Sequence, residues 1–253
     1  IDMEKHLYAL ILLIVLLSGC SNETQQTVLT VSAASSLSDV LQDAATQFQV
    51  EHPTISIQFN FGASGSLKEQ IEQGAPVDLF ISASIEKYEE LVNERLIDPG
   101  VNLASNEIVL ITSVKSTVNL QEFSDIVHDA IEKIAIGTPS IVPAGTYGKQ
   151  ALHYYDVWAS IENKIVYAKD VRQVLTYVET NNAQAGIVYK TDAIPSDKVR
   201  IVNTTGESTH DAIFYPAGVV NSTKAPKEAS LFLQYIQSED VQHIWEQYGF
   251  QME

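Results

Sequence analysis

Short apolar runs alternate with segments of helical periodicity along most of the chain. The first pair begins at Val28, where an apolar run passes through small residues into apolar positions spaced three and four apart as far as Phe48. A short apolar run predicts a buried strand, and the longer spacing predicts an amphipathic helix. Ser36 precedes the first apolar helical residue and Asp39 follows three positions later, a pattern typical of a capping box at a helix that begins near Leu37.

The same order of strand, small-residue turn and helix then recurs. Phe59 and Phe61 belong to an alternating strand pattern that leads through residues 62–66 into a second helical run. Ser84 and Asp170 are good N-caps for later helices. Further strands are expected at residues 79–81, 107–112, 134–137, 165–168 and 185–188. Strands separated by helices predict an α/β fold with parallel sheets.

The turns that follow these strands are candidates for a binding site. In open α/β sheets, ligands bind beyond the carboxyl ends of the strands. A helix start also offers unpaired backbone N–H groups and the positive end of a helix dipole, which together attract an anion. A capped helix without a ligand would explain any one turn alone, so the prediction depends on their repetition. The residues expected at this edge are Ser36, Ser64, Ala144, Val171 and Tyr189.

Length and charge limit the possible functions. A chain of 253 residues suffices for one large domain or for two lobes of roughly 100 to 120 residues. The 32 acidic and 15 basic residues give a net charge of -17, which argues against a nucleic-acid partner. This charge also gives no long-range attraction to an anion. An anion site must therefore depend on local dipoles and hydrogen bonds.

The N-terminus has the pattern of a secretory signal. Basic residues precede an apolar run from Leu7 to Leu17, which is too short to span a membrane. The run ends in the sequence LSGC, which resembles the bacterial lipobox, where cleavage before the cysteine is followed by lipid attachment. We therefore expect a signal peptide at residues 1–19, and a lipidated Cys20 with its tether at residues 20–27, which would place the protein outside the cytoplasm on the cell membrane. An ordinary signal peptide or a short buried helix with an incidental cysteine is the alternative. Because Cys20 is the only cysteine, disulfides and cysteine-ligated metals are excluded from the remaining chain.

From Val28 to Phe250 the sequence resembles the extracytoplasmic molybdate-binding proteins of ABC importers. Seven segments carry the resemblance in order, namely residues 34–37, 61–67, 74–83, 142–145, 170–172, 186–193 and 248–250. The resemblance implies a two-lobed periplasmic-binding-protein fold of type II. Each lobe would be a mostly parallel sheet flanked by helices, with the ligand in the cleft between lobes that close on it. It places one lobe at residues 28–106 with 213–253 and the other at residues 107–212.

The resemblance also implies a ligand set and a function. The oxyanion would be held by the hydroxyls and amides of Ser36 and Ser64, the amides of Ala144 and Val171, and the hydroxyl of Tyr189. The protein would bind molybdate, and also tungstate, with high affinity and deliver it to an ABC permease and its ATPase. We expect a monomer with no cofactor, no metal bound directly by side chains and no catalytic step. Molybdate and tungstate are fully ionised dianions, so a site composed of donors suits them.

The sequence leaves two questions undecided, namely which further residues contact the ligand and which anion it is. Ser35 and Ser66 are further candidates for a ligand contact. The ligand could also be another oxyanion, such as sulfate or phosphate, or a small carboxylate. Carboxylate binders usually use an arginine fork, whereas we interpret Arg172 and Lys68, which lie beside the candidate turns, as solvated helix charges.

A serine hydrolase is the principal enzyme alternative. Residues 62–66 imitate a nucleophile elbow, but that motif requires glycine where Ser66 stands. His210 and Asp211 are adjacent, as in a surface turn, and the histidines lack the spacing of a metal site. A structural adhesin is disfavoured because the chain has no repeats or low-complexity segments.

Overall fold

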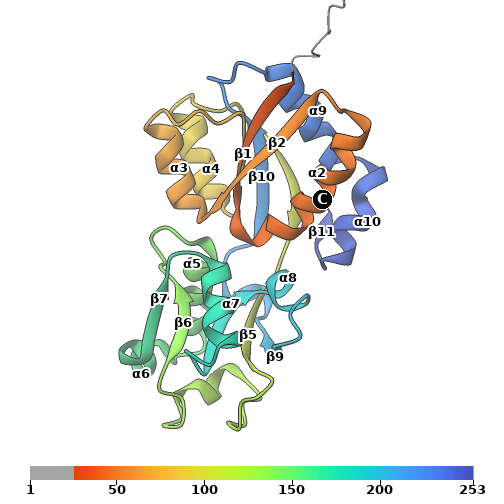
Figure 1. Cartoon of the computed structure of the whole chain (residues 1–253). Coiled ribbons are helices and arrows are strands. Elements are labelled where there is room, and N and C mark those ends of the chain that lie inside the picture. The colour runs from red at the N-terminus through yellow and green to blue at the C-terminus, as the bar shows by residue number, and fades with distance from the viewer. Residues whose placement is uncertain (1–25, 253) are drawn as a thin grey trace, which may run out of the picture.

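The computed structural model describes residues 26–252, apart from the side chain of Glu207, and places them in two sheets flanked by helices (Figure 1). The expected signal peptide and the expected lipidation site Cys20 lie outside the described residues. None of the helices within residues 26–252 is long and apolar enough to cross a membrane.

The first sheet has the strand order β11-β4-β10-β3-β1-β2. Its strands are β1 (Thr27–Ala34), β2 (Ile55–Gly62), β3 (Leu79–Ile81), β4 (Val101–Ser105), β10 (Phe214–Val219) and β11 (Gln251–Met252). Its helices are α2 (Ser38–Glu51), α3 (Ser64–Glu72), α4 (Ile85–Asn93), α9 (Pro226–Ile236) and α10 (Glu239–Gln247), with the 3-10 turn η1 (Ser35–Leu37) before α2. Helices α3 and α4 cover one face, and α2, α9 and α10 cover the other (Figure 1).

The second sheet has the strand order β7-β6-β8-β5-β9. Its strands are β5 (Ile108–Ser113), β6 (Ile134–Gly137), β7 (Ile165–Ala168), β8 (Ala185–Tyr189) and β9 (Val199–Thr204). Its helices are α5 (Pro143–Tyr154), α6 (Trp158–Ile161), α7 (Val171–Glu179) and α8 (Lys190–Ala193), with 3-10 turns η2 (Phe123–Val127), η3 (Glu162–Lys164) and η4 (Glu207–Thr209). Helix α7 packs on Gly186 and α5 on Ile187. Neighbouring strand residues point to opposite faces, so these two helices sandwich the sheet.

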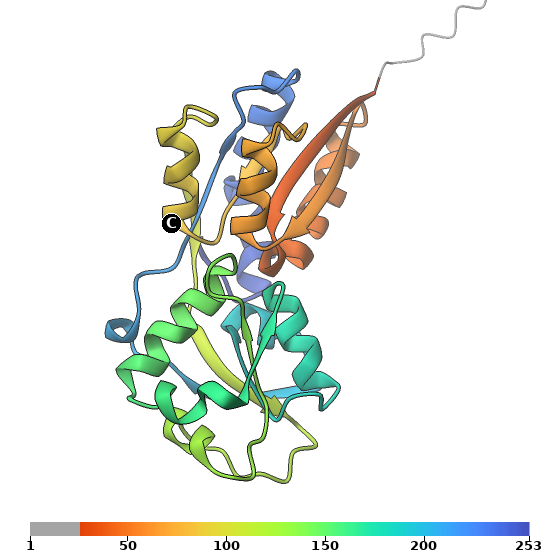
Figure 2. The ribbon, with the colours of Figure 1, turned by 90° about the vertical axis from the view of Figure 1, so that its left-hand side faces the viewer.

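The chain passes between the two sheets twice, through residues 106–107 and through residues 205–213 (Figure 2). Strands β10 and β5, which follow these passages, run antiparallel to their neighbours. The α/β class with two helix-flanked sheets is confirmed, but both sheets are mixed rather than mostly parallel. A strand that enters from the other lobe starts at the edge where β1, β3, β6 and β8 end, so it must run the opposite way.

Two of the three expected helix caps are confirmed. The Ser84 side chain accepts a hydrogen bond from the Lys87 amide, and the Asp170 side chain accepts one from the Gln173 amide. The capping box at Ser36 is wrong. Residues 35–37 form the 3-10 turn η1, and α2 begins without a side-chain cap. The Ser36 hydroxyl is instead turned toward the buried Tyr215, with the two oxygens 3.2 Å apart.

Candidate functional site

A small cavity lies where the strand ends and helix starts of the two lobes meet. It contains no more than about 190 Å³ of space between the atoms. The structure brings all five expected residues to its wall, namely Ser36, Ser64, Ala144, Val171 and Tyr189. Ser35 also lines it, whereas Ser66 is not among the described lining residues.

The positions of the five residues follow from the order of strands and helices. Ser36 lies in η1 directly after β1, and Ser64 opens α3 after β2. Ala144 is in the first turn of α5, Val171 is the first residue of α7, and Tyr189 ends β8. The first amides of a helix have no partner inside the helix and carry the positive end of its dipole. Three helix starts therefore present donors to one point, an arrangement that suits an anion.

Two of the hydroxyl groups at the cavity are available as donors. The Ser64 oxygen accepts a hydrogen bond from the Ala83 amide at 2.9 Å, which leaves its own hydrogen free. The Tyr189 hydroxyl is buried and has no hydrogen-bond partner among residues 26–252. Burial raises the pKa of Tyr189 well above its ordinary value, so the hydroxyl keeps its proton. A buried hydroxyl without a partner costs about 1–3 kcal/mol, and a ligand oxygen in the cavity would remove that cost.

The two lobes touch beside the cavity. The Gly65 amide, at the start of α3, donates a hydrogen bond to the carbonyl of Ile141 in the other lobe at 2.9 Å. A Cβ atom at Gly65 would lie only 2.7 Å from the Ile141 Cα, so only glycine permits this approach. The structure therefore shows the lobes closed around the cavity.

Arg172 and Lys68 are ion-paired, so the expectation of two solvated helix charges is wrong. Lys68 pairs with Glu72 and Glu90 on the first lobe. Arg172 pairs with Asp39 of the first lobe and Asp192 of the second. Because these cations are already compensated by carboxylates and do not line the cavity, the site is formed by neutral donors.

Asp192 is fully buried beside Arg172. Its Oδ1 lies 3.0 Å from the Arg172 Nε, close enough for an ion pair, yet neither atom has a hydrogen bond within the described part of the chain. Burial raises the pKa of the Asp192 carboxyl to about 7, although the charge of Arg172 acts in the opposite direction. Desolvation therefore outweighs the ion pair at this carboxyl.

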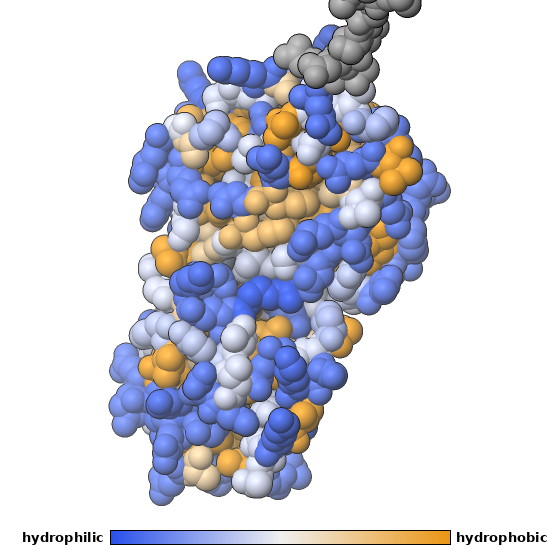
Figure 3. All heavy atoms as spheres, in the orientation of Figure 1, coloured by the Kyte–Doolittle hydropathy of each residue, from blue (hydrophilic) through white to orange (hydrophobic). Residues whose placement is uncertain are grey.

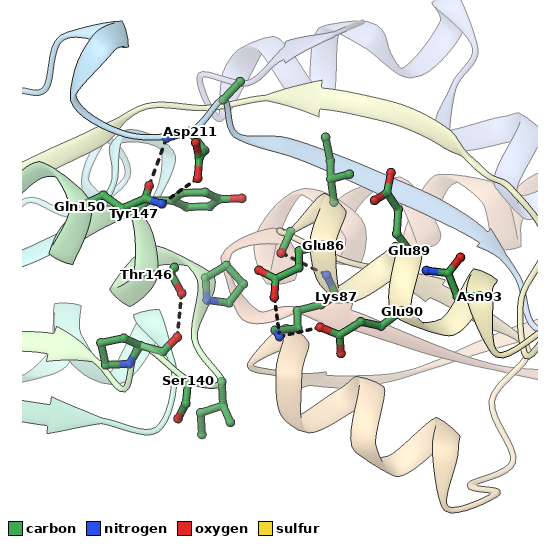
Figure 4. A pocket seen from close by; sticks show the side chains of 16 residues that line it. Glu86, Lys87, Glu89, Glu90, Asn93, Ser140, Thr146, Tyr147, Gln150 and Asp211 are labelled. Atoms are coloured by element: carbon green, nitrogen blue, oxygen red, sulfur yellow. Dashed lines mark hydrogen bonds and ion pairs between the residues drawn. The ribbon is translucent and has the colours of Figure 1, made fainter.

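A wider pocket lies between α4 and residues 139–150 of the second lobe (Figure 4). Its acidic lining residues are Glu86, Glu89, Glu90 and Asp211. Its cation, Lys87, is paired with Glu86 and Glu90. Hydrophilic side chains also cover most of the molecular face in Figure 3. An excess of carboxylates repels an anion, so the inner cavity is the better anion site.

The geometry does not support a hydrolase. The Nε2 atom of His210 lies 2.8 Å from the Thr205 hydroxyl, and its Nδ1 lies 2.7 Å from the Asp211 carbonyl. Among the described residues the hydrogen-bond partner of the Ser64 hydroxyl is the Ala83 amide, a donor, so they provide no base for Ser64. Within residues 26–252, no group of three or more His, Cys, Asp or Glu side chains could hold a metal ion.

Two lobes closed on a cavity of neutral donors define a solute-binding protein. The chain belongs to the bacterial extracellular solute-binding protein family, whose family model matches residues 29–251. This match confirms the family that the sequence motifs indicated.

Individual relatives match along nearly the whole chain. The provisionally named ABC transporter substrate-binding lipoprotein YvgL of Bacillus subtilis is 45% identical, over 94% of each chain. The molybdate-binding protein ModA of Escherichia coli is 36% identical, over 88% of each chain. The solved structure of the periplasmic molybdate-binding protein of Azotobacter vinelandii superposes with a TM-score of 0.80 at 24% identity, covering 88% of this chain and 98% of that one. This last likeness confirms the fold.

Sequence reasoning missed two residues next to the site. Tyr215 of β10 contacts the Ser36 hydroxyl, and Asn106 in the first passage between the lobes contacts Tyr215. Neither residue belongs to a strand-to-helix turn, which was the signal used to find the other candidates. Their proximity depends on the passages between lobes, so no local pattern reveals it.

Proposed function

We propose that this protein binds molybdate, and also tungstate, outside the cell and delivers it to an ABC permease driven by a cytoplasmic ATPase. The observation that carries the proposal is the cavity of hydroxyls and helix-start amides without a basic side chain. Molybdate and tungstate are tetrahedral dianions that accept hydrogen bonds on every oxygen and donate none. The relative named above as the molybdate-binding protein ModA of Escherichia coli supports the same ligand.

The proposed ligand set consists of the amides and hydroxyls of Ser36 and Ser64, the amides of Ala144 and Val171, and the hydroxyl of Tyr189. About seven charge-assisted hydrogen bonds contribute roughly 1.5–3 kcal/mol each. Association costs on the order of 4–15 kcal/mol. The upper part of the resulting range reaches the roughly 8 kcal/mol of micromolar binding and exceeds it. The absence of a fixed cation from this set keeps release to the permease feasible.

Delivery requires that the lobes open and close. We propose that residues 28–106 with 213–253 and residues 107–212 move as two lobes about the passages between them, and that the monomer performs no catalytic step. The lipobox-like segment at Cys20, together with the word lipoprotein in the name of YvgL, supports a lipid anchor on the cell membrane. A Cys20→Ala variant released from the membrane fraction would agree with this anchor, and a variant retained there would contradict it.

Titration calorimetry of the purified protein tests the ligand. Molybdate and tungstate should each bind one to one, and sulfate should bind at least about a hundredfold more weakly, which corresponds to roughly 2.7 kcal/mol. Sulfate or phosphate binding as tight as that of molybdate would contradict the molybdate assignment and leave an oxyanion carrier. If none of these anions gave heat, the hydrolase alternative would be tested next through ester turnover and its loss in Ser64→Ala.

A further inference from the structure

A chain of hydrogen bonds leads from the first passage between the lobes to the cavity. The Asn106 amide nitrogen donates to the Tyr215 hydroxyl oxygen at 2.8 Å. The Tyr215 hydroxyl lies in turn 3.2 Å from the hydroxyl of Ser36, which lines the cavity. Tyr215 is fully buried, so each of its hydrogen-bonding atoms needs a partner within the protein.

The orientation of the Asn106 amide group is fixed by its neighbours. Its Oδ1 accepts a hydrogen bond from the Glu107 amide at 2.9 Å. Its two N–H bonds serve Tyr215 and the Thr191 hydroxyl, each at 2.8 Å. A flipped amide would place the nitrogen against the Glu107 N–H, so the observed orientation is the satisfied one. Asn106 therefore acts as a donor to Tyr215.

This donor sets the direction of the next two hydrogen bonds. Because the Tyr215 oxygen already accepts from Asn106, its hydrogen needs an acceptor, and within the described residues that acceptor is the Ser36 oxygen. The reverse direction would bury the Tyr215 hydrogen without an acceptor, which folded proteins avoid. The Ser36 oxygen thus accepts from Tyr215, and its own hydrogen is left to point into the cavity.

We propose that Asn106 and Tyr215 are positioning residues that make the Ser36 hydroxyl a donor, and that they thereby favour fully deprotonated oxyanions over protonated ones. This inference rests on the proposed function. The Ser64 hydroxyl is oriented in the same way by the Ala83 amide. A monohydrogen oxyanion brings an O–H group that needs an acceptor, and hydroxyls held as donors present hydrogens to it instead of lone pairs.

Sulfate and hydrogen phosphate isolate this effect from cavity size and charge. At about pH 8.5 both are tetrahedral dianions of similar size, and they differ in the one P–O–H group. Each is measured by its competition against molybdate, in the full-length wild type and in Tyr215→Phe. The phenyl ring keeps the packing of Tyr215 against Tyr189 and Phe250.

In Tyr215→Phe the Ser36 hydroxyl is free to accept as well as donate. We expect molybdate affinity to fall several-fold and the ratio of sulfate to hydrogen phosphate affinity to fall about tenfold. A purely structural defect would weaken both anions equally, so an unchanged ratio would overturn the proposal. Tyr155→Phe, in a ring that stacks on Phe123 away from the cavity, is the matched control and should leave the ratio unchanged.

Two further variants keep the inference testable. In a Ser36→Ala background, Tyr215→Phe should no longer change molybdate affinity, because Tyr215 acts through the Ser36 hydroxyl; an equal loss in both backgrounds would overturn the proposal. If Tyr215→Phe does not fold, Asn106→Asp replaces the donor by an acceptor and should lower the same ratio. The added charge affects both dianions alike, so it cancels from the ratio.

A wild type that binds no molybdate would contradict the proposed function itself, whereas molybdate binding with unchanged ratios would contradict only the role of Asn106 and Tyr215.

Discussion

Arg172 of α7 and Asp39 of α2 form an ion pair between the two lobes, with Nη2 2.6 Å from Oδ2. The two residues lie beside the cavity but do not line it. Their side chains are 27% and 37% exposed, so water weakens the pair. The ion pair joins the lobes only when they are closed, and it therefore adds to ligand affinity without being a ligand contact.

Replacing Asp39 by Asn should weaken this closed form. An ion pair at such exposure contributes about 0.2–1 kcal/mol, so we expect molybdate affinity to fall by no more than about fivefold. Titration calorimetry measures the loss, and a higher salt concentration should reduce the difference from wild type.

Asp43→Asn is the matched control for Asp39→Asn. Asp43 lies one turn further along α2, and its carboxylate accepts a hydrogen bond from Tyr248 within the first lobe at 2.6 Å. This variant removes the same charge without touching the contact between lobes, so its molybdate affinity should stay near that of the wild type. Equal losses in Asp39→Asn and Asp43→Asn would show that net charge, not closure, is responsible.

Gly65→Ala should obstruct closure by steric contact. The added methyl group would lie 2.7 Å from the Ile141 Cα and 2.8 Å from its carbonyl oxygen, both backbone atoms that cannot rotate away. We expect molybdate affinity to fall at least about tenfold, or roughly 1.4 kcal/mol, while each lobe stays folded. Small-angle scattering with saturating molybdate should give a larger radius of gyration than for the wild type.

Gly206→Ala provides the comparison for Gly65→Ala. Gly206 has a φ of -76°, which any residue adopts, and a Cβ there would meet only the Thr209 methyl at 3.8 Å. This variant should bind molybdate as the wild type does. Wild-type affinity in Gly65→Ala as well would mean that ligand binding does not require the closed contact seen here.

The sequence predicts the local elements well because their signals are local. The strands expected at residues 79–81, 134–137 and 165–168 have the observed bounds, and the helix starts at Ser84 and Asp170 are capped as expected. Strands β4, β9 and β10 were not predicted. The first of these begins with exposed residues, and the three pair only with partners distant in the sequence.

The same distinction between local signals and long-range contacts applies to the residues of the site. The strand-to-helix turns and the family motifs predicted five of the residues that line the cavity, since each lies in a recognisable segment. The direction of the Ser36 side chain could not be predicted, because serine at a helix start ordinarily caps the helix. It depends on Tyr215, 179 positions away in the chain. The partners of Arg172 are likewise set by how the lobes meet, which no periodicity encodes.

Tyr189→Phe should separate ligand binding from stability. In the closed structure the Tyr189 hydroxyl is buried without a partner among the described residues, so removing it relieves a cost of about 1–3 kcal/mol in the closed form without ligand. We expect an unchanged or higher Tm without ligand, together with a loss of molybdate affinity of about ten- to a hundredfold. A packing role alone would predict a lower Tm and unchanged affinity, so thermal unfolding and calorimetry on the same samples decide between them.

Asp192 should make stability depend on pH in a defined direction. Burial raises the pKa of its carboxyl from an ordinary 3.8 to about 7 in the folded protein. Between about pH 4 and 7 the folded state therefore holds a proton that the unfolded state has lost. Stability falls with rising pH wherever the folded state binds more protons, so the contribution of Asp192 is present below about pH 4 and is lost as the pH rises to about 7.

The variant Asp192→Asn cannot titrate, so the difference between wild type and variant isolates this contribution from all other carboxyls. The free energy of unfolding of the wild type, relative to the variant, should fall steadily from about pH 4.5 to 7 and stay level above. Denaturant unfolding of both proteins across that range measures it. A difference that rises with pH would mean that Arg172 keeps Asp192 ionised and lowers its pKa. The slope therefore decides whether burial or the ion pair controls this carboxyl beside the cavity.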